Sequence, residues 1–184
     1  IFAVKPVAII QARMSSSRFP GKVLADICGK PMLYYVVSRA QRAHAVNLIA
    51  VATSDQQIDD VIENFCAAVH VPCFRGDRDD VLDRYYRAAG ELRADTIVRL
   101  TADCPLLDPI IVDKVVGSFM AGQFDYVSNT REPTYPDGLD TEVFTRKALE
   151  QAWREARLQS EREHVTPYIT KNPKLFRIGN VKHH

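Results

Sequence analysis

The stretch "VAIIQARMSSSRFPGK", residues 7–22, joins a short apolar run to a loop rich in groups that bind anions. The β-branched run at 7–10 is typical of a buried strand. The loop after it contains two arginines, three serines and a lysine: Arg13, Ser15, Ser16, Ser17, Arg18 and Lys22. An ordinary loop whose arginines pair with nearby carboxylates remains possible. We favour a phosphate-binding loop at a strand end, because cations and hydroxyls neutralise and hydrogen-bond phosphate oxygens.

The segments that follow alternate between strand-like and helical patterns. The helical period in "PMLYYVVSRAQRA" places Leu33, Val36, Val37 and Ala40 on one face. We expect further strands at 48–52, 69–74, 96–100 and 124–128, and further helices opened by Asp55, over 79–94, from Asp108 and around Trp153. Ile58, Val61, Ile62 and Phe65 are the predicted buried face of the second helix. This alternation predicts an α/β fold with a mostly parallel central sheet and helices on both faces.

Composition narrows the function classes. The 184 residues fit one domain, and 24 Lys and Arg balance 23 Asp and Glu, so we expect neither a nucleic-acid nor a membrane partner. We see no span-length apolar run and no secretory signal, so we expect a cytoplasmic protein. Four cysteines without a C-x-x-C pair suggest neither zinc nor disulfides but buried, reduced thiols.

The opening loop is not a standard nucleotide motif. Gly21-Lys22 is followed by Val23 rather than Ser or Thr, and no glycine stands five residues before Gly21, so it is not a Walker A loop. The dinucleotide pattern G-x-G-x-x-G is also absent.

Other candidate residues follow later strands, where ligands of open α/β sheets bind. Asp103 in "TADCP" suits Mg²⁺, which prefers oxygen ligands, although it could also cap the turn before Pro105. In "FRGDRDDVLDRYYRAA" Arg84 is a ligand candidate, whereas Asp79 and Asp80 at a helix start suit the helix dipole. The insertion "TREPTYPDGLDTE", residues 130–142, carries an acidic cluster suited to sugar hydroxyls or a metal: Asp137, Asp140 and Glu142.

Seven blocks in order carry a resemblance to a known family: "IIQARMSSSRFPGKVL", "GKPML", "VATSD", "FRGDRDDVLDRYYRAA", "VRLTADCPLLDP", "YPDGLDTEVF" and "EREHVTPYI". They resemble the spore coat polysaccharide biosynthesis protein F group, which is similar to 3-deoxy-manno-octulosonate and acylneuraminate cytidylyltransferases. The resemblance implies the three-layer nucleotide-diphospho-sugar transferase fold. It also implies transfer of CMP from CTP to an acidic sugar, octulosonate- or nonulosonate-like, with release of pyrophosphate, for surface polysaccharide biosynthesis.

The resemblance also implies roles for individual residues. It aligns Arg13, Ser16, Arg18 and Lys22 with the family's triphosphate-binding loop, and Asp103 with the family's metal-binding aspartate. We expect Arg13, Lys22 and Asp103 to be catalytic, Ser15 and Arg84 to add nucleotide contacts, and Asp137, Asp140 and Glu142 to bind the sugar. Glu163 and His164 could line the sugar pocket, form a subunit contact or lie on a plain helix surface. Family members are commonly dimers, so we expect a homodimer, with contact near Trp153 and Tyr168.

Two departures leave alternatives open. Octulosonate enzymes typically carry Pro-Ala-Arg where this chain has Gln11-Ala12-Arg13, so the sugar can differ. Family members also continue beyond a segment like "LFRIGNVK" to a second metal-binding aspartate. We therefore expect residues 1–184 to form one nucleotidyltransferase-like domain without that C-terminal segment. A glycosyltransferase of the same fold, or a non-catalytic nucleotide-binding domain, remains an alternative, and pyrophosphate release distinguishes them.

Overall fold

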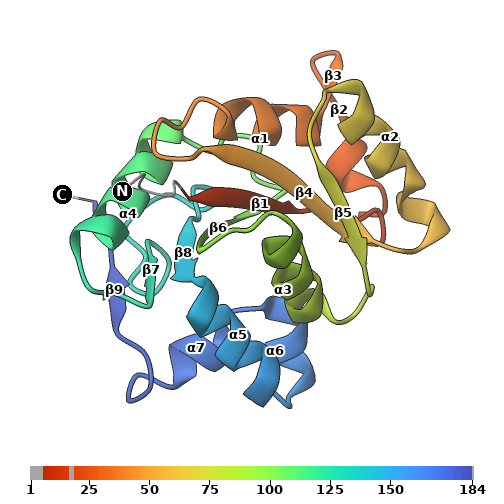
Figure 1. Cartoon of the computed structure of the whole chain (residues 1–184). Coiled ribbons are helices and arrows are strands. Elements are labelled where there is room, and N and C mark those ends of the chain that lie inside the picture. Colours follow the sequence, from red (N-terminus) through yellow and green to blue (C-terminus); the bar gives the residue numbers. More distant parts are fainter. Residues whose placement is uncertain (1–5, 17–18, 184) are drawn as a thin grey trace.

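The β-branched runs of the sequence form the strands of one mixed sheet. The computed structural model describes residues 6–16 and 19–183, and in this part of the chain the sheet has seven strands in the order β5-β4-β1-β6-β8-β7-β9 (Figure 1). The strands are β1 (Val7–Gln11), β4 (Leu48–Ser54), β5 (Cys73–Gly76), β6 (Thr96–Thr101), β7 (Tyr126–Ser128), β8 (Glu142–Thr145) and β9 (Ile178–Asn180). All of these strands except β8 run in one direction, which confirms the predicted mostly parallel sheet.

Helices cover both faces of the sheet and give the predicted three layers (Figure 1). One face carries α1 (Met32–Ala40), α2 (Asp60–Ala68) and α4 (Pro109–Ala121), and the other carries α3 (Val81–Glu91), α5 (Arg146–Glu155), α6 (Gln159–His164) and α7 (Pro167–Lys171). Side chains of β1 alternate between them: Ala8 and Ile10 pack on the first face, and Val7 and Ile9 on the second. The sheet therefore separates two hydrophobic cores and presents its strand ends at an edge.

The predicted helix starts are partly correct. The Asp108 side chain accepts a hydrogen bond from the Ile110 backbone N–H and caps α4, as expected. The prediction that Asp55 opens a helix is wrong, because a 3₁₀ turn, η2 (Gln57–Asp59), precedes α2. Ile58 and Val61 of the predicted buried face are 57% and 44% exposed. Ile58 lies in the 3₁₀ turn, which has three residues per turn and is therefore out of phase with the α-helix that follows, whereas Val61 lies on an exposed side of α2 itself.

Two predicted strands begin later than expected, and β8 and β9 were not predicted; β7 begins at Tyr126 rather than at 124. β5 begins at Cys73 rather than at 69, because Val69 still belongs to the C-terminal cap of α2. The strand β8 was not expected, since it lies at the end of the predicted insertion and is only four residues long. It pairs antiparallel with both β6 and β7, so partners far away in sequence stabilise it.

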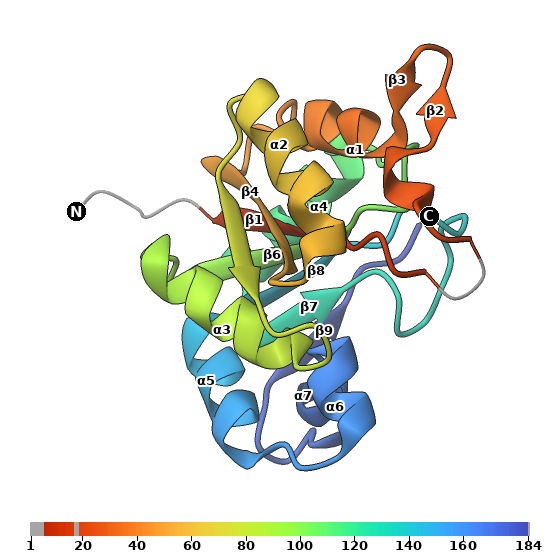
Figure 2. The same cartoon turned by 90° about the vertical axis from the view of Figure 1, so that its right-hand side faces the viewer.

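A two-stranded hairpin and the cysteines complete the description. The hairpin of β2 (Asp26–Ile27) and β3 (Lys30–Pro31) follows a 3₁₀ turn, η1 (Lys22–Leu24), and projects from the sheet (Figure 2).

All four cysteines are free, but Cys28 at the tip of the hairpin is exposed, contrary to the expectation of buried thiols. Cys66 is fully buried. Within the described residues, no helix has the length and apolar character to cross a membrane.

Candidate active site

The register of the sheet brings three loops together at one edge. Gln11 at the end of β1 lies opposite Ala52 in β4 and Thr101 in β6. The loops after these parallel strands therefore begin side by side. This is the edge at which α/β sheets bind ligands.

A buried aspartate fixes the start of the opening loop. Asp59 is fully buried, and its carboxylate accepts a hydrogen bond from the Met14 backbone N–H at 2.7 Å and others from Ser54. The Met14 carbonyl in turn accepts hydrogen bonds from the N–H groups of Ser16 and Gly21, at 2.9 and 2.8 Å. Gly21 has a φ of 75°, a conformation that favours glycine, and it turns the chain into η1. The loop is thus closed on itself and tied to the end of β4.

The closed loop forms one wall of a cavity of ≈ 230 Å³, here called the strand-end cavity. Its lining residues are Gln11, Arg13, Ser16, Lys22, Val23, Arg99, Thr101, Ala102 and Asp103. The Lys22 Nζ donates to Asp103 Oδ2 at 2.8 Å, across 81 positions of sequence. Four residues predicted from the sequence, Arg13, Ser16, Lys22 and Asp103, therefore meet around one space.

The charges of this cavity favour an ionised Asp103. Partial burial by itself would raise the pKa of Asp103, but the hydrogen bond and the positive charge of Lys22 outweigh it and lower the pKa. Arg13 lies 3.7 Å from the carboxylate of Glu163, and both side chains are about one-third exposed. Three cationic side chains and one carboxylate thus line the cavity, an arrangement that suits a phosphate chain with a metal ion.

A second space, here called the adjoining cavity, continues past Arg99 and Thr101, which line both. It measures ≈ 250 Å³, and its other lining residues are Thr130, Asp140, Glu142, His164, Thr166 and Pro167. Desolvation, with the charges of Asp137 and Glu142, raises the pKa of Asp140. Hydroxyl, carboxylate and imidazole groups face this space, so it suits a polyhydroxylated ligand.

The Glu142 carboxylate is bound by other protein groups. Its Oε1 accepts hydrogen bonds from the Tyr126 hydroxyl at 2.6 Å and the Thr166 hydroxyl at 2.7 Å, and its Oε2 pairs with Arg99. Both carboxylate oxygens are therefore engaged by protein groups. Arg99 also donates to the Gln11 side chain at 3.2 Å, so Glu142 helps to hold the boundary between the two cavities.

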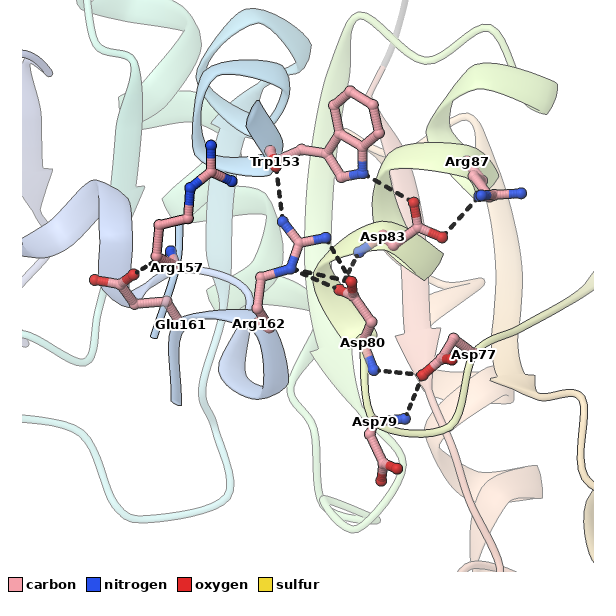
Figure 3. A network of polar contacts seen from close by, with 9 residues as sticks. All are labelled: Asp77, Asp79, Asp80, Asp83, Arg87, Trp153, Arg157, Glu161 and Arg162. Atoms are coloured by element: carbon pink, nitrogen blue, oxygen red, sulfur yellow. Dashed lines mark hydrogen bonds and ion pairs between the residues drawn. The ribbon is translucent and has the colours of Figure 1, made fainter. Parts of the chain in front are cut away.

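The short helix α6 supplies further residues from the second core. Arg162 forms an ion pair with Asp80, the N-cap of α3, and donates to the Trp153 carbonyl at 2.7 Å (Figure 3). This network fixes the next two residues, so that Glu163 meets Arg13 and His164 lines the adjoining cavity. Trp153 donates to Asp83 and is half-buried, and the subunit contact expected near it stays a prediction.

Other predicted residues lie elsewhere. Ser15 is exposed and Asp137 is exposed, and neither lines the two cavities; Arg18 lies outside the described residues. Arg84 is fully buried and lines neither cavity. Sequence reasoning missed Arg99 as a site residue, although a charged residue within the apolar run "TIVRL" is a signal for a buried ion pair.

The donor set around Asp103 fits a shared metal site. Among the described residues, no group of three or more His, Cys, Asp or Glu side chains could hold a metal ion by itself. A single ionised carboxylate in a cationic cavity fits Mg²⁺ only if phosphate oxygens and water complete its shell, as is usual for this ion.

Taken together, the mostly parallel sheet between two layers of helices, the cationic loop and the carboxylate at a strand end fit a nucleotidyltransferase. The family model described as cytidylyltransferase matches residues 7–184. The chain belongs to this family.

Individual relatives agree with that assignment. The spore coat polysaccharide biosynthesis protein SpsF of Bacillus subtilis is 34% identical over 176 residues, which cover 92% of this chain and 72% of the relative. A 3-deoxy-manno-octulosonate cytidylyltransferase of Geobacter sulfurreducens is 39% identical over 109 residues, but these cover only 59% of this chain and 43% of that enzyme. The solved structure of a cytidylyltransferase from Leptospira borgpetersenii serovar Hardjo-bovis superimposes with a TM-score of 0.94 at 34% identity, covering 99% of this chain and 77% of that one. The predicted family resemblance and fold are thus confirmed.

Proposed function

We propose that this protein transfers CMP from CTP to an acidic sugar and releases pyrophosphate. The observation that carries the proposal is the meeting of Arg13, Lys22 and Asp103 in the strand-end cavity, directly beside a second cavity lined by polar groups. One space suits a triphosphate and the other an acceptor. The acidity of the acceptor sugar is inferred from the names of the relatives and not from a contact in this chain.

The chain's own residues have clear tasks in such a reaction. The oxygen of the acceptor hydroxyl bonds to the α-phosphorus and its proton passes to water, while the bond from that phosphorus to the bridging oxygen breaks and pyrophosphate leaves. Negative charge therefore builds up on the leaving group. Arg13 and Lys22 would neutralise that charge, and preorganised charges of this kind are usually the largest catalytic contribution. Asp103 would hold a Mg²⁺ ion, which when bound polarises phosphate oxygens and neutralises their charge. Ser16, with Ser15 and Arg18 on the same loop, would bind the phosphates.

The acceptor would occupy the adjoining cavity. Asp140 and His164 face this space and can accept or donate hydrogen bonds to sugar hydroxyls. Asp137 and Glu142 stay predictions as sugar ligands. Both carboxylate oxygens of Glu142 already contact other protein groups. A role in surface polysaccharide synthesis, a cytoplasmic location and a homodimer belong to the same proposal.

Nucleotide binding tests the proposal first. Calorimetry with CTP, UTP, GTP and ATP, each with and without Mg²⁺, should show binding of CTP that depends on the metal. Pyrophosphate release should then appear with CTP and an acidic sugar such as 3-deoxy-manno-octulosonate or N-acetylneuraminate. Absence of nucleotide binding would contradict the proposal. Binding of a nucleotide sugar without pyrophosphate release would favour a glycosyltransferase.

A further inference from the structure

Gln11 and Arg99 lie where the two cavities of the candidate site meet. Arg99 lines both cavities, and Gln11 lines the strand-end cavity. Side chains alternate between the two faces of a strand, so Arg99 and Thr101 of β6, and Gln11 opposite Thr101 in β1, leave the same face of the sheet. A ligand group at the border between the cavities therefore lies beside these side chains.

Protein contacts hold the Arg99 guanidinium in place without using all of its donors. Its Nη1 pairs with Glu142, and its Nη2 donates to the Gln11 Oε1 at 3.2 Å. The guanidinium carbon also lies 6.0 Å from the centre of the Tyr85 ring. An arginine has more N–H groups than these two hydrogen bonds occupy. Arg99 is therefore fixed in position and keeps donors for a ligand.

The Gln11 amide offers a neutral donor beside this cation. Its Oε1 accepts the hydrogen bond from Arg99, which leaves its amide nitrogen for another partner. Among the described residues, no protein group accepts a hydrogen bond from this nitrogen, and Gln11 lines the strand-end cavity, so the donor is available to a ligand there. Octulosonate enzymes typically carry a proline at this position, which has no such donor.

The charges around the two cavities differ in sign. Most charged side chains that line the strand-end cavity are cations: Arg13, Lys22 and Arg99. The adjoining cavity has the carboxylates of Asp140 and Glu142, with Arg99 at its border. An anionic group of an acceptor is therefore repelled least at the border, whereas hydroxyl groups suit the side of Asp140.

The covalent structure of the acceptor brings its carboxylate to the same border. This step rests on the proposed function, in which CTP and an acidic sugar fill the two cavities. In octulosonate- and nonulosonate-like sugars, the carboxylate is bonded to the carbon that carries the reacting hydroxyl. That hydroxyl must reach the α-phosphorus between the cavities, so the carboxylate comes close to a negatively charged phosphate. Donors are needed there to offset the repulsion.

We propose that Arg99 and Gln11 bind the carboxylate of the acceptor and thereby select an acidic sugar. Arg99 supplies a positive charge already fixed by Glu142, and the Gln11 amide N–H supplies a second hydrogen bond from the neighbouring strand. Hydrogen bonds to a charged group are stronger than those between neutral groups. The pair therefore distinguishes a carboxylate from a neutral group of the same shape.

Substitutions of Gln11 and a neutral form of the acceptor test this assignment. The acceptors are 3-deoxy-manno-octulosonate and N-acetylneuraminate, each as the acid and as the carboxamide, in which a neutral group of similar shape replaces the carboxylate. Pyrophosphate release with CTP and Mg²⁺ gives kcat/KM for each form. The wild type should use the acid at least about tenfold better than the carboxamide, as expected for hydrogen bonds to a charged group.

The variants should change this preference rather than activity in general. Q11M, of similar length, should lower kcat/KM for the acid about tenfold, mainly through the KM of the sugar, and that for the carboxamide by less. Q11E should remove or reverse the preference, because its carboxylate repels that of the acid and accepts a hydrogen bond from the carboxamide. R99K should narrow the preference, since an ammonium lacks the planar fork that reaches Glu142 and a ligand together. Q41M and Q41E, at the exposed cap of α1, are the matched controls and should leave the preference unchanged.

The outcomes separate this assignment from the proposed function. If the wild type releases no pyrophosphate with CTP and any of these acceptors, the proposed function fails and the assignment fails with it. If the wild type turns over an acid without preferring it to the carboxamide, or if Q11M, Q11E and R99K all keep the preference, only the carboxylate assignment is overturned. Equal losses for acid and carboxamide would show that Gln11 acts on the nucleotide or the fold, and would also overturn it. Should Q11E or R99K not fold, the preference of Q11M decides.

Discussion

The contact between Lys22 and Asp103 contributes little to stability, and we propose that both groups act in the reaction instead. Their side chains are 29% and 45% exposed, so the pair stabilises the fold by only about 0–1 kcal/mol. The same exposure lets each group exchange its partner for a ligand. Lys22 can move to a phosphate oxygen, and Asp103 is then free for a metal ion.

Substituting these residues one at a time should separate their roles. K22A should weaken CTP binding roughly 10- to 100-fold with or without Mg²⁺, because a charged hydrogen-bond donor is lost. D103N should weaken only the Mg²⁺-dependent part of binding. Calorimetry measures both effects, and each change should lower pyrophosphate release by roughly a hundredfold or more.

The control for this pair is K30A, on the hairpin away from the cavities. All three variants should unfold within about 1 kcal/mol of the wild type. A mild effect of both K22A and D103N on binding and turnover would contradict the assignment of the strand-end cavity.

Among the elements, α6 depends on a tertiary contact. It is only six residues long, too short to be stable alone, so its position comes from what it touches. The Arg162 guanidinium contacts both oxygens of Asp80 as well as the Trp153 carbonyl (Figure 3). Trp153 in turn stacks on Tyr86 with ring centroids 4.3 Å apart. Helices α3, α5 and α6 are thereby joined at one point.

Removing Arg162 should loosen this junction. R162A should reduce the free energy of unfolding by about 1–3 kcal/mol, because it leaves a partly buried carboxylate and a carbonyl without their donor. Urea unfolding followed by fluorescence of Trp153, the single tryptophan, measures this. R154A, which removes an exposed pair with Glu150 within α5, should cost about 0.5 kcal/mol or less. Equal losses from the two variants would show that the junction adds nothing beyond a surface ion pair.

For the whole molecule, the far edge of the sheet is held by charge as well as by backbone pairing. Asp125, before β7, pairs with Arg177, before β9, at 3.1 Å, and its carboxylate also accepts from the Arg177 backbone N–H. Burial alone would raise the pKa of Asp125, but these hydrogen bonds and the Arg177 charge lower it. A carboxyl whose pKa is lower in the folded state stabilises the fold above its unfolded pKa, and this stability is lost as pH falls through the folded value.

Acid should therefore weaken the protein through this edge. The unfolding temperature should hold between pH 7 and about 5 and fall as pH drops below about 4, where ordinary aspartate begins to protonate. D125N should unfold at a lower temperature at pH 7 and lose less between pH 5 and 3, as followed by circular dichroism. Parallel curves for wild type and D125N would contradict a role for this pair in acid sensitivity.

The helices and the strand-end loops could be predicted because their signals are local. The cap and first-turn proline of α4, and the apolar period of α1, depend on residues within a few positions of each other. The loop that we propose to bind phosphates has a local signal for the same reason, and parallel strands necessarily bring their following loops to one edge. Asp103 could thus be expected near Lys22 without knowledge of the distance.

By itself the sequence determined the α/β class and the cationic loop, since periodicity and local composition act over one helical turn or one strand. The family followed from the resemblance of its seven sequence blocks to a known group. Only the tertiary structure decided that β8 runs antiparallel, that Glu142 pairs with Arg99, and that the buried Arg84 guanidinium has no hydrogen-bond partner among the described residues. Whether a charged side chain is paired, exposed or isolated depends on groups tens of residues away. No local pattern encodes those distances.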